Sequence, residues 1–247
     1  MSKLLWDQTG ERRYETGCDR GVLYTGKNTA ANDPRAYDNA EAWNGLTSVT
    51  DKPSGAEATK IYADNILYGS MRAAEDFGGS IEAYTYPDGF AACNGEASPT
   101  GMKGLRVGQQ KRQSFGFSYR SDVGDDTDPS IDTENDYILH LWWNCTASPS
   151  ERQYQTINES PEAITMSWEI ETIPEKINGM KPSAWMTIDT TKCTPTELEN
   201  LQVLEDILYG RDASTGENPV EAITPYLPTP DEVINIMKTG TPTAIPT

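Results

Sequence analysis

Residues 163–173 read AITMSWEIETI, and the alternation in this stretch indicates the fold class. Apolar side chains occupy every second position, at Ile164, Met166, Trp168 and Ile170. Polar side chains occupy the positions between them, at Thr165, Ser167, Glu169 and Glu171. Because successive side chains of a β-strand point to opposite faces, the stretch predicts an antiparallel strand with one buried and one solvated face.

The same period of two recurs elsewhere in the chain. SFGFSYR (114–120) places its aromatic residues on one face, whereas DYILHLWW (136–143) is apolar on both faces. A strand of the second kind is covered on both sides, either at the centre of a sheet or at a contact between subunits. Further strands are expected within 21–25, 60–72, 80–87 and 183–189, and the second and third are close enough in sequence to pair. The expected fold class is therefore mainly β.

One amphipathic helix is expected at about 194–209, within CTPTELENLQVLEDILYGR. Thr194 and Glu197 have the spacing of a capping box, and the proline between them suits the first helical position. Gly210 suits the end of the helix. The helical period predicts a buried stripe made of Leu198, Leu201, Leu204, Ile207 and Leu208. A second, shorter helix is expected within 230–238.

The remaining segments are less regular. Residues 26–45 are polar and are interrupted by turn-forming glycine, asparagine and proline residues. This composition predicts a long loop or arm rather than an ordinary connection inside a domain. From Arg211 onward, prolines interrupt any continuous element, so 211–247 is expected to form a proline-rich C-terminal arm. The folded domain is therefore expected to span residues 1–210.

A formal net charge of −18 and an isoelectric point of about 4.4 limit the functional classes. A surface this acidic repels phosphate backbones, so binding to nucleic acid through counterion release is disfavoured. Hydrophobic residues make up 36% of the chain, which is enough for a folded core. No window approaches the roughly 18 apolar residues of a membrane span, and no signal peptide is expected. The four scattered cysteines indicate reduced thiols.

Catalytic patterns are sparse. His140 is the single histidine, so a histidine-rich metal centre is impossible, and a serine or cysteine nucleophile would have to use this one ring. Its place in the aromatic strand 136–143 favours a packed histidine over a general base. Acidic residues are abundant, but no pair is singled out for hydrolysis, and no glycine-rich phosphate loop has the required spacing. We therefore expect neither an enzyme nor a bound cofactor.

The segment 121–136, SDVGDDTDPSIDTEND, carries seven acids and no base. An EF-hand calcium loop needs a glycine at its sixth position, and that pattern fails here. A solvated loop is favoured over a looser calcium site. The candidate ligands of that alternative site are Asp122, Asp125, Asp126 and Asp128. Residues 97–121 contain five bases and no acid, so the two segments either neutralise each other or form complementary faces of an assembly.

Six stretches together resemble one protein family. They are LLWDQTGERRYETGCDRGVLY, AWNGLTSVTDKPSGAEATKIYADNILY, EDFGGSIEAYTYPDGFAACNG, VGQQKRQSFGFSYRS, YQTINESPEAITMSWEIETIP and PSAWMTIDTTKCTPTELENLQVLEDILYG. They run in order from about residue 4 to 210 and cover most of the chain. Their combination resembles the major tail proteins, or tail tube proteins, of long, non-contractile-tailed bacteriophages of the siphovirus type, especially those infecting Gram-positive hosts. The residues beyond Arg211 lie outside the resemblance.

The resemblance implies a β-sandwich or partial barrel with one flanking helix, a long inter-subunit loop and extended termini. Six copies would form a ring by extending their sheets across subunits, and stacked rings would form the tube that conducts DNA into the host. The implied partners are sister copies, a tape measure protein, a tail terminator and a distal tail protein. Genomic DNA would pass through without specific binding. The implied location is the virion, and the host cytoplasm during assembly, without membrane association.

Two sets of residues are candidates for roles in such a tube. The lumen-facing candidates are the outward residues of the strand quoted first, Thr165, Ser167, Glu169 and Glu171. The inter-subunit candidates come from the N-terminal segment, from 26–45 and from 136–143, and are Trp6, Arg12, Arg13, Tyr37, Trp43, Ile138, His140 and Trp142. Two other classes stay open, namely a virion decoration or tail-tip protein and a lectin-like, carbohydrate-binding β-sandwich. A glycosidase fits the sequence least well.

Overall fold

The computed structural model describes residues 3–30, 32–55, 57–102, 104–126, 136–149, 152, 154, 156, 163–214 and 220–245. The strands of its main sheet are β1 (Tyr14–Lys27), β2 (Arg35–Ala42), β3 (Leu46–Asp51), β8 (Gly78–Ala83), β9 (Phe115–Gly124), β10 (Tyr137–Ala147), β11 (Met166–Thr172), β12 (Trp185–Asp189) and β13 (Leu227–Pro228). Two small ladders pair β4 (Ser54–Gly55) with β7 (Glu75–Asp76), and β5 (Ala58–Ala63) with β6 (Ile66–Arg72). The helices are α1 (Phe90–Cys93), the 3-10 turn Thr190–Lys192, α2 (Pro195–Tyr209) and α3 (Pro230–Thr239).

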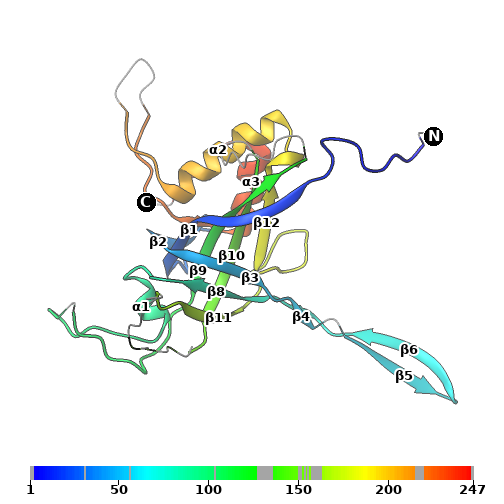
Figure 1. Ribbon diagram of the computed structural model, residues 1–247, viewed down its shortest axis with the longest axis horizontal. Helices are drawn as coiled ribbons and strands as arrows, with labels where there is room; N and C mark the ends of the chain where they lie inside the picture. Colours follow the sequence, from blue (N-terminus) through cyan, green and yellow to red (C-terminus); the bar gives the residue numbers. More distant parts are fainter. Residues whose placement is uncertain are drawn as a thin grey trace.

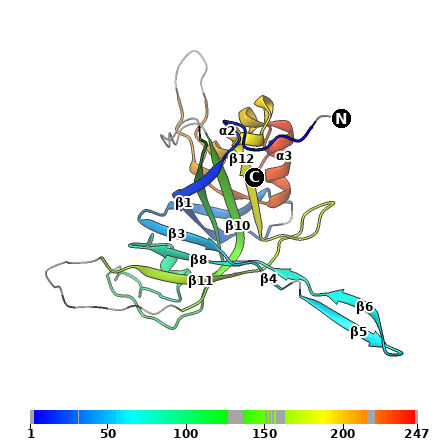
Figure 2. The ribbon, with the colours of Figure 1, turned by 45° about the vertical axis from the view of Figure 1, so that its right-hand side comes forward.

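Nine strands of the described residues form one antiparallel sheet in the order β13-β2-β1-β9-β10-β11-β8-β3, with β12 beside β10 (Figure 1). The N-terminal half of β10 pairs with β12, and its C-terminal end pairs with β11. In Figures 1 and 2, α2 and α3 lie against the half of the sheet that contains β1 and β10, away from β8 and β11. The mainly β fold class expected from the sequence is confirmed.

The sheet curls so strongly that the chain entering β3 returns beside β1. The Trp43 amide extends the β1–β2 ladder by one residue, donating to the Gly21 carbonyl at 2.7 Å, and β3 then turns back against β1. A Cβ at Gly21 would meet a methyl group of Leu46, so β3 packs closely on β1 at this glycine. Figure 2 shows β8 and β11 running across the direction of β10. The result is a partial barrel, since the sheet of the described residues does not close.

Aromatic rings fill the inside of the curled sheet. Trp43, Phe90 and Trp168 meet there, with centroids 4.6 Å apart for Trp43 and Phe90 and 5.0 Å apart for Phe90 and Trp168. The Trp43 indole N–H donates to the Thr85 carbonyl at 2.9 Å, so its polar atom is satisfied although the ring is buried. This inner core gives the partial barrel a filled interior rather than a pore.

A second core lies on the outer face of the sheet. Leu139 and Leu141 of β10 pack there in one cluster with Leu204 of α2 and Val233 of α3. Trp142, the residue after Leu141 in β10, faces the inner core. The strand is therefore covered on both faces, as its sequence predicts, and the subunit itself provides both layers.

Helix α2 agrees with the sequence in its bounds and its cap. The Thr194 hydroxyl accepts from the Glu197 amide, and the Glu197 carboxylate accepts from the Thr194 amide, which completes the expected capping box. The buried stripe begins one turn later than expected, because Leu198 is 43% exposed. Helix α3 confirms the short helix expected within 230–238.

Three segments differ from the sequence-based expectations. Residues 35–42 of the expected loop 26–45 form β2, which lies between β1 and β13 in the sheet. The expected C-terminal arm supplies β13 and α3, and Leu227 of β13 is fully buried. Residues 60–72 do not pair with β8, because the turn at Asp64 and Asn65, both with positive φ, folds β5 directly onto β6.

No helix in the described part of the chain is both long and apolar enough to cross a membrane.

Replacing Leu204 by Ala should lower the free energy of unfolding by about 2–5 kcal/mol, because it leaves a cavity between α2 and the sheet. The matched change Leu198→Ala, at the exposed position of the same helix, should alter it by less than about 0.5 kcal/mol. Denaturant unfolding followed by circular dichroism measures both. Equal effects would contradict the placement of the helix.

Candidate functional site

A polar surface forms the outer face of β3, β8 and β11. Opposite its residues, Trp168 and Ile170 point into the inner core. The register aligns the polar side chains of the three strands, placing Ser167 beside Glu82 and Ser48, and Glu169 beside Ser80 and Thr50. We call the set on this face formed by Ser48, Thr50, Ser80, Glu82, Ser167, Glu169 and Glu171 the acidic sheet face; Ser80, on the central strand, is buried between its neighbours.

The lumen-facing candidates lie on or next to the acidic sheet face. Thr165, Glu169 and Glu171 are exposed and Ser167 is half-buried. The predicted alternation is confirmed for Trp168–Glu171, whereas Ile164 is 43% exposed. Glu169 pairs with Lys52 Nζ at 2.7 Å, and both side chains are about half exposed or more, so the pair adds little stability. Whether this face lines a lumen stays a prediction.

The hairpin β5–β6 projects from the body beyond the short β4–β7 ladder (Figures 1 and 2). Its register places Ile61, Ile66 and Met71 on one face, and Tyr62 with Leu67 on the other. Apart from Ile61, these side chains and Tyr68 are between 54% and 76% exposed. An isolated two-stranded hairpin is marginally stable in water, and an apolar group of this kind marks an interaction site.

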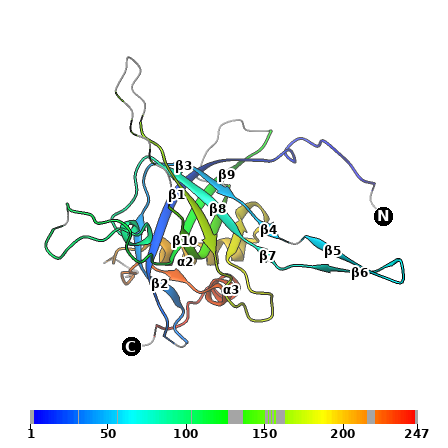
Figure 3. The ribbon, with the colours of Figure 1, turned by 90° about the horizontal axis from the view of Figure 1, so that it is seen from below.

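The N-terminal arm, residues 3–13, is held at one point and exposed beyond it. The Gly10 amide donates to Asp126 Oδ1 at 2.8 Å, and the Arg12 guanidinium lies 3.7 Å from the same carboxylate. Leu4, Leu5 and Trp6 are 65% to 73% exposed. Figure 3 shows the arm and the hairpin extending from the same side of the body.

The inter-subunit candidates divide into two groups. Trp6, Arg12 and Arg13 are exposed in the N-terminal arm and stay candidates. Ile138 is half-buried between β9 and β12. The other four, Tyr37, Trp43, His140 and Trp142, are buried within the subunit. The curled sheet and the helical layer cover these four side chains in the subunit, and a contact with a neighbour stays a prediction for them.

His140 lies at one end of the inner core beside a serine and a carboxylate. Its Nε2 is 2.9 Å from Ser121 Oγ and 3.4 Å from Glu15 Oε1, and its ring stacks on Tyr119 with centroids 4.4 Å apart. Burial lowers the pKa of His140, although Glu15 and Asp51 oppose this. In a Ser-His-acid relay the acid holds the other ring nitrogen. Here both groups contact Nε2, and Nδ1 has no hydrogen-bond partner, so the arrangement differs from such a relay.

The acidic segment 121–136 is described only in part, and Asp128 lies outside the described residues. Asp122 belongs to β9, whereas Asp126 holds the N-terminal arm. Among the described residues no group of three or more His, Cys, Asp or Glu side chains is arranged to hold a metal. In the described part of this segment, Asp126 therefore attaches the N-terminal arm to the body.

Several bases of the segment 97–121 are paired inside the subunit. Arg106 binds Asp88 at 2.7 Å, and Arg112 donates to the Ala147 carbonyl at 2.6 Å. The buried Arg120 guanidinium lies over the Tyr137 ring. For Arg106 and Arg112 the partners lie outside 121–136, whereas the Arg120 charge also acts on Asp122 in that segment, so contacts within the subunit are favoured over a complementary face.

Replacing residues 58–72 by a short Gly-Ser linker should leave the free energy of unfolding within about 1 kcal/mol of the original, because exposed positions contribute little to the fold. Thermal unfolding and far-ultraviolet circular dichroism measure the result. As a control, replacement of β2, residues 35–42, should abolish cooperative unfolding. A large loss of stability in the hairpin variant would show that the hairpin belongs to the core.

Comparisons with known proteins leave the family of this chain open. No protein-family model matches the sequence, and no curated protein matches it. One solved structure with some likeness is the sheath–tube complex of an extracellular contractile injection system, in its extended state. Its TM-score is 0.31 at 8% sequence identity, covering 69% of this chain and 88% of the other. A likeness of that degree is too distant to assign a fold family or a function.

Proposed function

We propose that the chain is a structural virion protein that self-assembles into stacked six-membered rings, which form the tail tube of a siphovirus-type phage and conduct DNA into the host. The observation that carries the proposal is the projecting hairpin β5–β6, whose two faces expose apolar side chains. Within the subunit these side chains gain little burial, so a second chain is the means by which they leave water.

The hairpin and the rest of the surface differ in chemistry, which favours a heterologous contact. Tyr62 and Leu67 on the hairpin have no equivalent on the polar acidic sheet face. A contact between two different patches of identical chains repeats from copy to copy, and it forms a ring where the rotation closes and a filament where it does not. Stacked rings combine both outcomes.

The acidic sheet face suits the wall of a DNA conduit. It presents Glu82, Glu169 and Glu171, with Lys52 paired to one of them. DNA moves freely only where the wall offers few cations, because each phosphate contact with Lys or Arg adds affinity through counterion release. The sequence stretches that resemble tail tube proteins support the same role.

The purified chain should form hollow tubes or six-fold rings when concentrated, seen by negative-stain microscopy and analytical ultracentrifugation. The double change Tyr62→Ser with Leu67→Ser should raise the concentration needed for assembly by about tenfold or more, because it removes apolar anchors from the contact. The control Ser70→Ala, on the same hairpin, should assemble normally. A chain that stays monomeric at every concentration, even beside preformed tail tips, and that binds glycans would favour the lectin-like alternative instead.

Changing both Glu169 and Glu171 to Lys should leave tubes intact but make them retain DNA, because the wall would then bind phosphates. Nucleic acid that co-purifies with tubes at 50 mM salt and is lost at 200 mM measures the effect. The matched control, Glu199→Lys on the exposed side of α2, should retain no more DNA than the original. A map of assembled tubes with Thr165, Ser167, Glu169 and Glu171 buried between subunits would refute the lumen assignment.

A further inference from the structure

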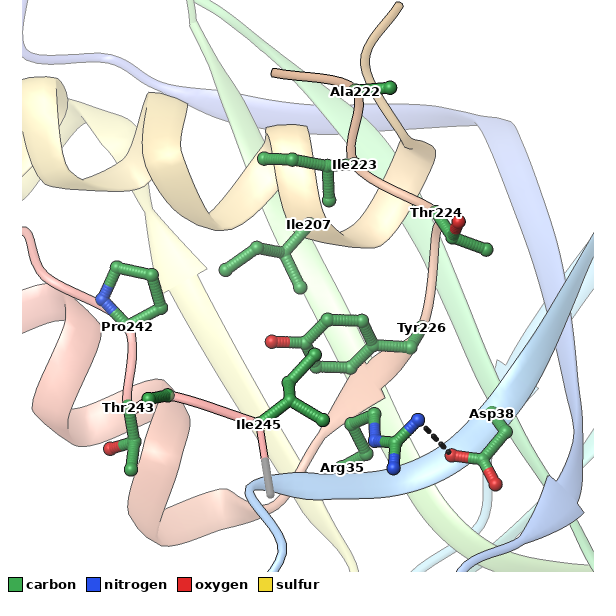
Figure 4. Close-up of a pocket in the computed structure, with 11 residues that line it drawn as sticks. Arg35, Asp38, Ile207, Ala222, Ile223, Thr224, Tyr226, Pro242, Thr243 and Ile245 are labelled. Atoms are coloured by element: carbon green, nitrogen blue, oxygen red, sulfur yellow. Dashed lines mark ion pairs between the residues drawn. The ribbon is translucent and has the colours of Figure 1, made fainter. Parts of the chain in front are cut away.

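An apolar pocket lies between the C-terminal end of α2, the segment that leads into β13, and residues 242–245 (Figure 4). Its volume is about 610 Å³, within the usual range for sites that bind a bulky group. Its apolar lining is formed by Ile207, Ala222, Ile223, Tyr226, Pro242, Ala244 and Ile245. The pocket therefore offers an apolar cavity that is large enough for an indole ring.

The rim of the pocket has an acidic side. Arg35 is held by Asp33 through two hydrogen bonds of 2.9 and 2.7 Å, so much of its charge is neutralised within the chain. Asp38 lies 3.3 Å from Arg35, and its side chain is 40% exposed. Two carboxylates thus share one guanidinium, which leaves Asp38 suited to a further cation. Burial raises the pKa of Tyr226 to about 12, so its hydroxyl stays protonated and able to donate.

The N-terminal arm has the complementary chemistry. Its outer residues, Lys3, Leu4, Leu5 and Trp6, combine one cation with three exposed apolar side chains. The arm is fixed to the body at Gly10 through Asp126. Figures 1 and 3 place the arm on the opposite side of the body from the C-terminal end that builds the pocket. The arm of one copy is therefore directed toward a neighbour rather than toward its own pocket.

We infer that the pocket receives Leu4, Leu5 and Trp6 from the N-terminal arm of a second copy of this chain. Trp6 fills the apolar cavity, and Lys3 pairs with Asp38 at the rim. The inference rests on the proposed self-assembly and deepens it by naming one contact. Because arm and pocket are different patches on opposite sides, each copy gives an arm to one neighbour and accepts one from another.

Two single changes, one on each side of the contact, test the inference in the full-length chain. Trp6→Ser removes the main anchor, and Ala244→Trp fills the pocket from an exposed position. Each should raise the concentration needed for assembly by about tenfold or more, because interface anchors of this size dominate binding. Thermal unfolding should be unchanged, since both positions are exposed. The control Met180→Ser, at another exposed apolar residue, should assemble normally.

Mixing the two variants separates this contact from a general loss of assembly. The Ala244→Trp chain keeps its arm and the Trp6→Ser chain keeps its pocket, so an equimolar mixture should form pairs that contain one of each, measured by sedimentation velocity. At the same concentration, either variant alone should stay monomeric. A mixture without pairs, or normal assembly of either variant, overturns the inference while leaving tube assembly through the hairpin intact. An original chain that never associates overturns both proposals, and intramolecular docking would appear as loss of stability in Trp6→Ser without a change in assembly.

Discussion

Strand β10 is packed on both of its faces, and the rest of the structure depends on that constraint. Leu139 and Leu141 pack in the outer cluster with α2 and α3, while Trp142 packs among the rings inside the curled sheet. A strand with two apolar faces is stable only when separate layers cover both. The helices must therefore lie outside the sheet, and the sheet must fold over to cover the inside. The close approach at Gly21 is the local consequence, since it lets the chain return beside β1.

This division separates the surface needed for folding from the surface left for assembly. Both cores are enclosed within the body of the subunit. The apolar residues of the hairpin and of the N-terminal arm belong to neither core. Single exposed apolar residues are normal on a protein surface. Groups of exposed apolar residues on two projecting elements instead indicate contacts with another molecule. Folding and association thus use different parts of the same sequence.

The sequence predicts the elements whose period is undisturbed, and it fails where polar residues or prolines mask a buried segment. The stretch 163–173 and helix α2 follow their patterns because one face of each is buried. In β2, Tyr37 is buried among polar neighbours, so alternation is too weak to detect. The helix expected within 230–238 is found, because Pro230 begins α3 where its missing amide costs nothing, but the prolines around it hid the buried strand β13. The period of 136–143 predicts two covered faces, but it does not indicate whether the cover comes from the same chain. In the subunit both His140 and Trp142 are already buried.

The net charge of −18 sets a condition on any contact between copies. Repulsion between exposed charges fades over a Debye length of about 8–10 Å at ordinary salt. Strand β6 has seven residues, and at about 3.3 Å per residue the hairpin reaches roughly 20 Å from its base. A contact at its tip therefore holds two acidic bodies farther apart than their repulsion extends, whereas flush packing of the same bodies would not. Projecting apolar elements let an acidic subunit associate without giving up the acidic face that keeps DNA from binding.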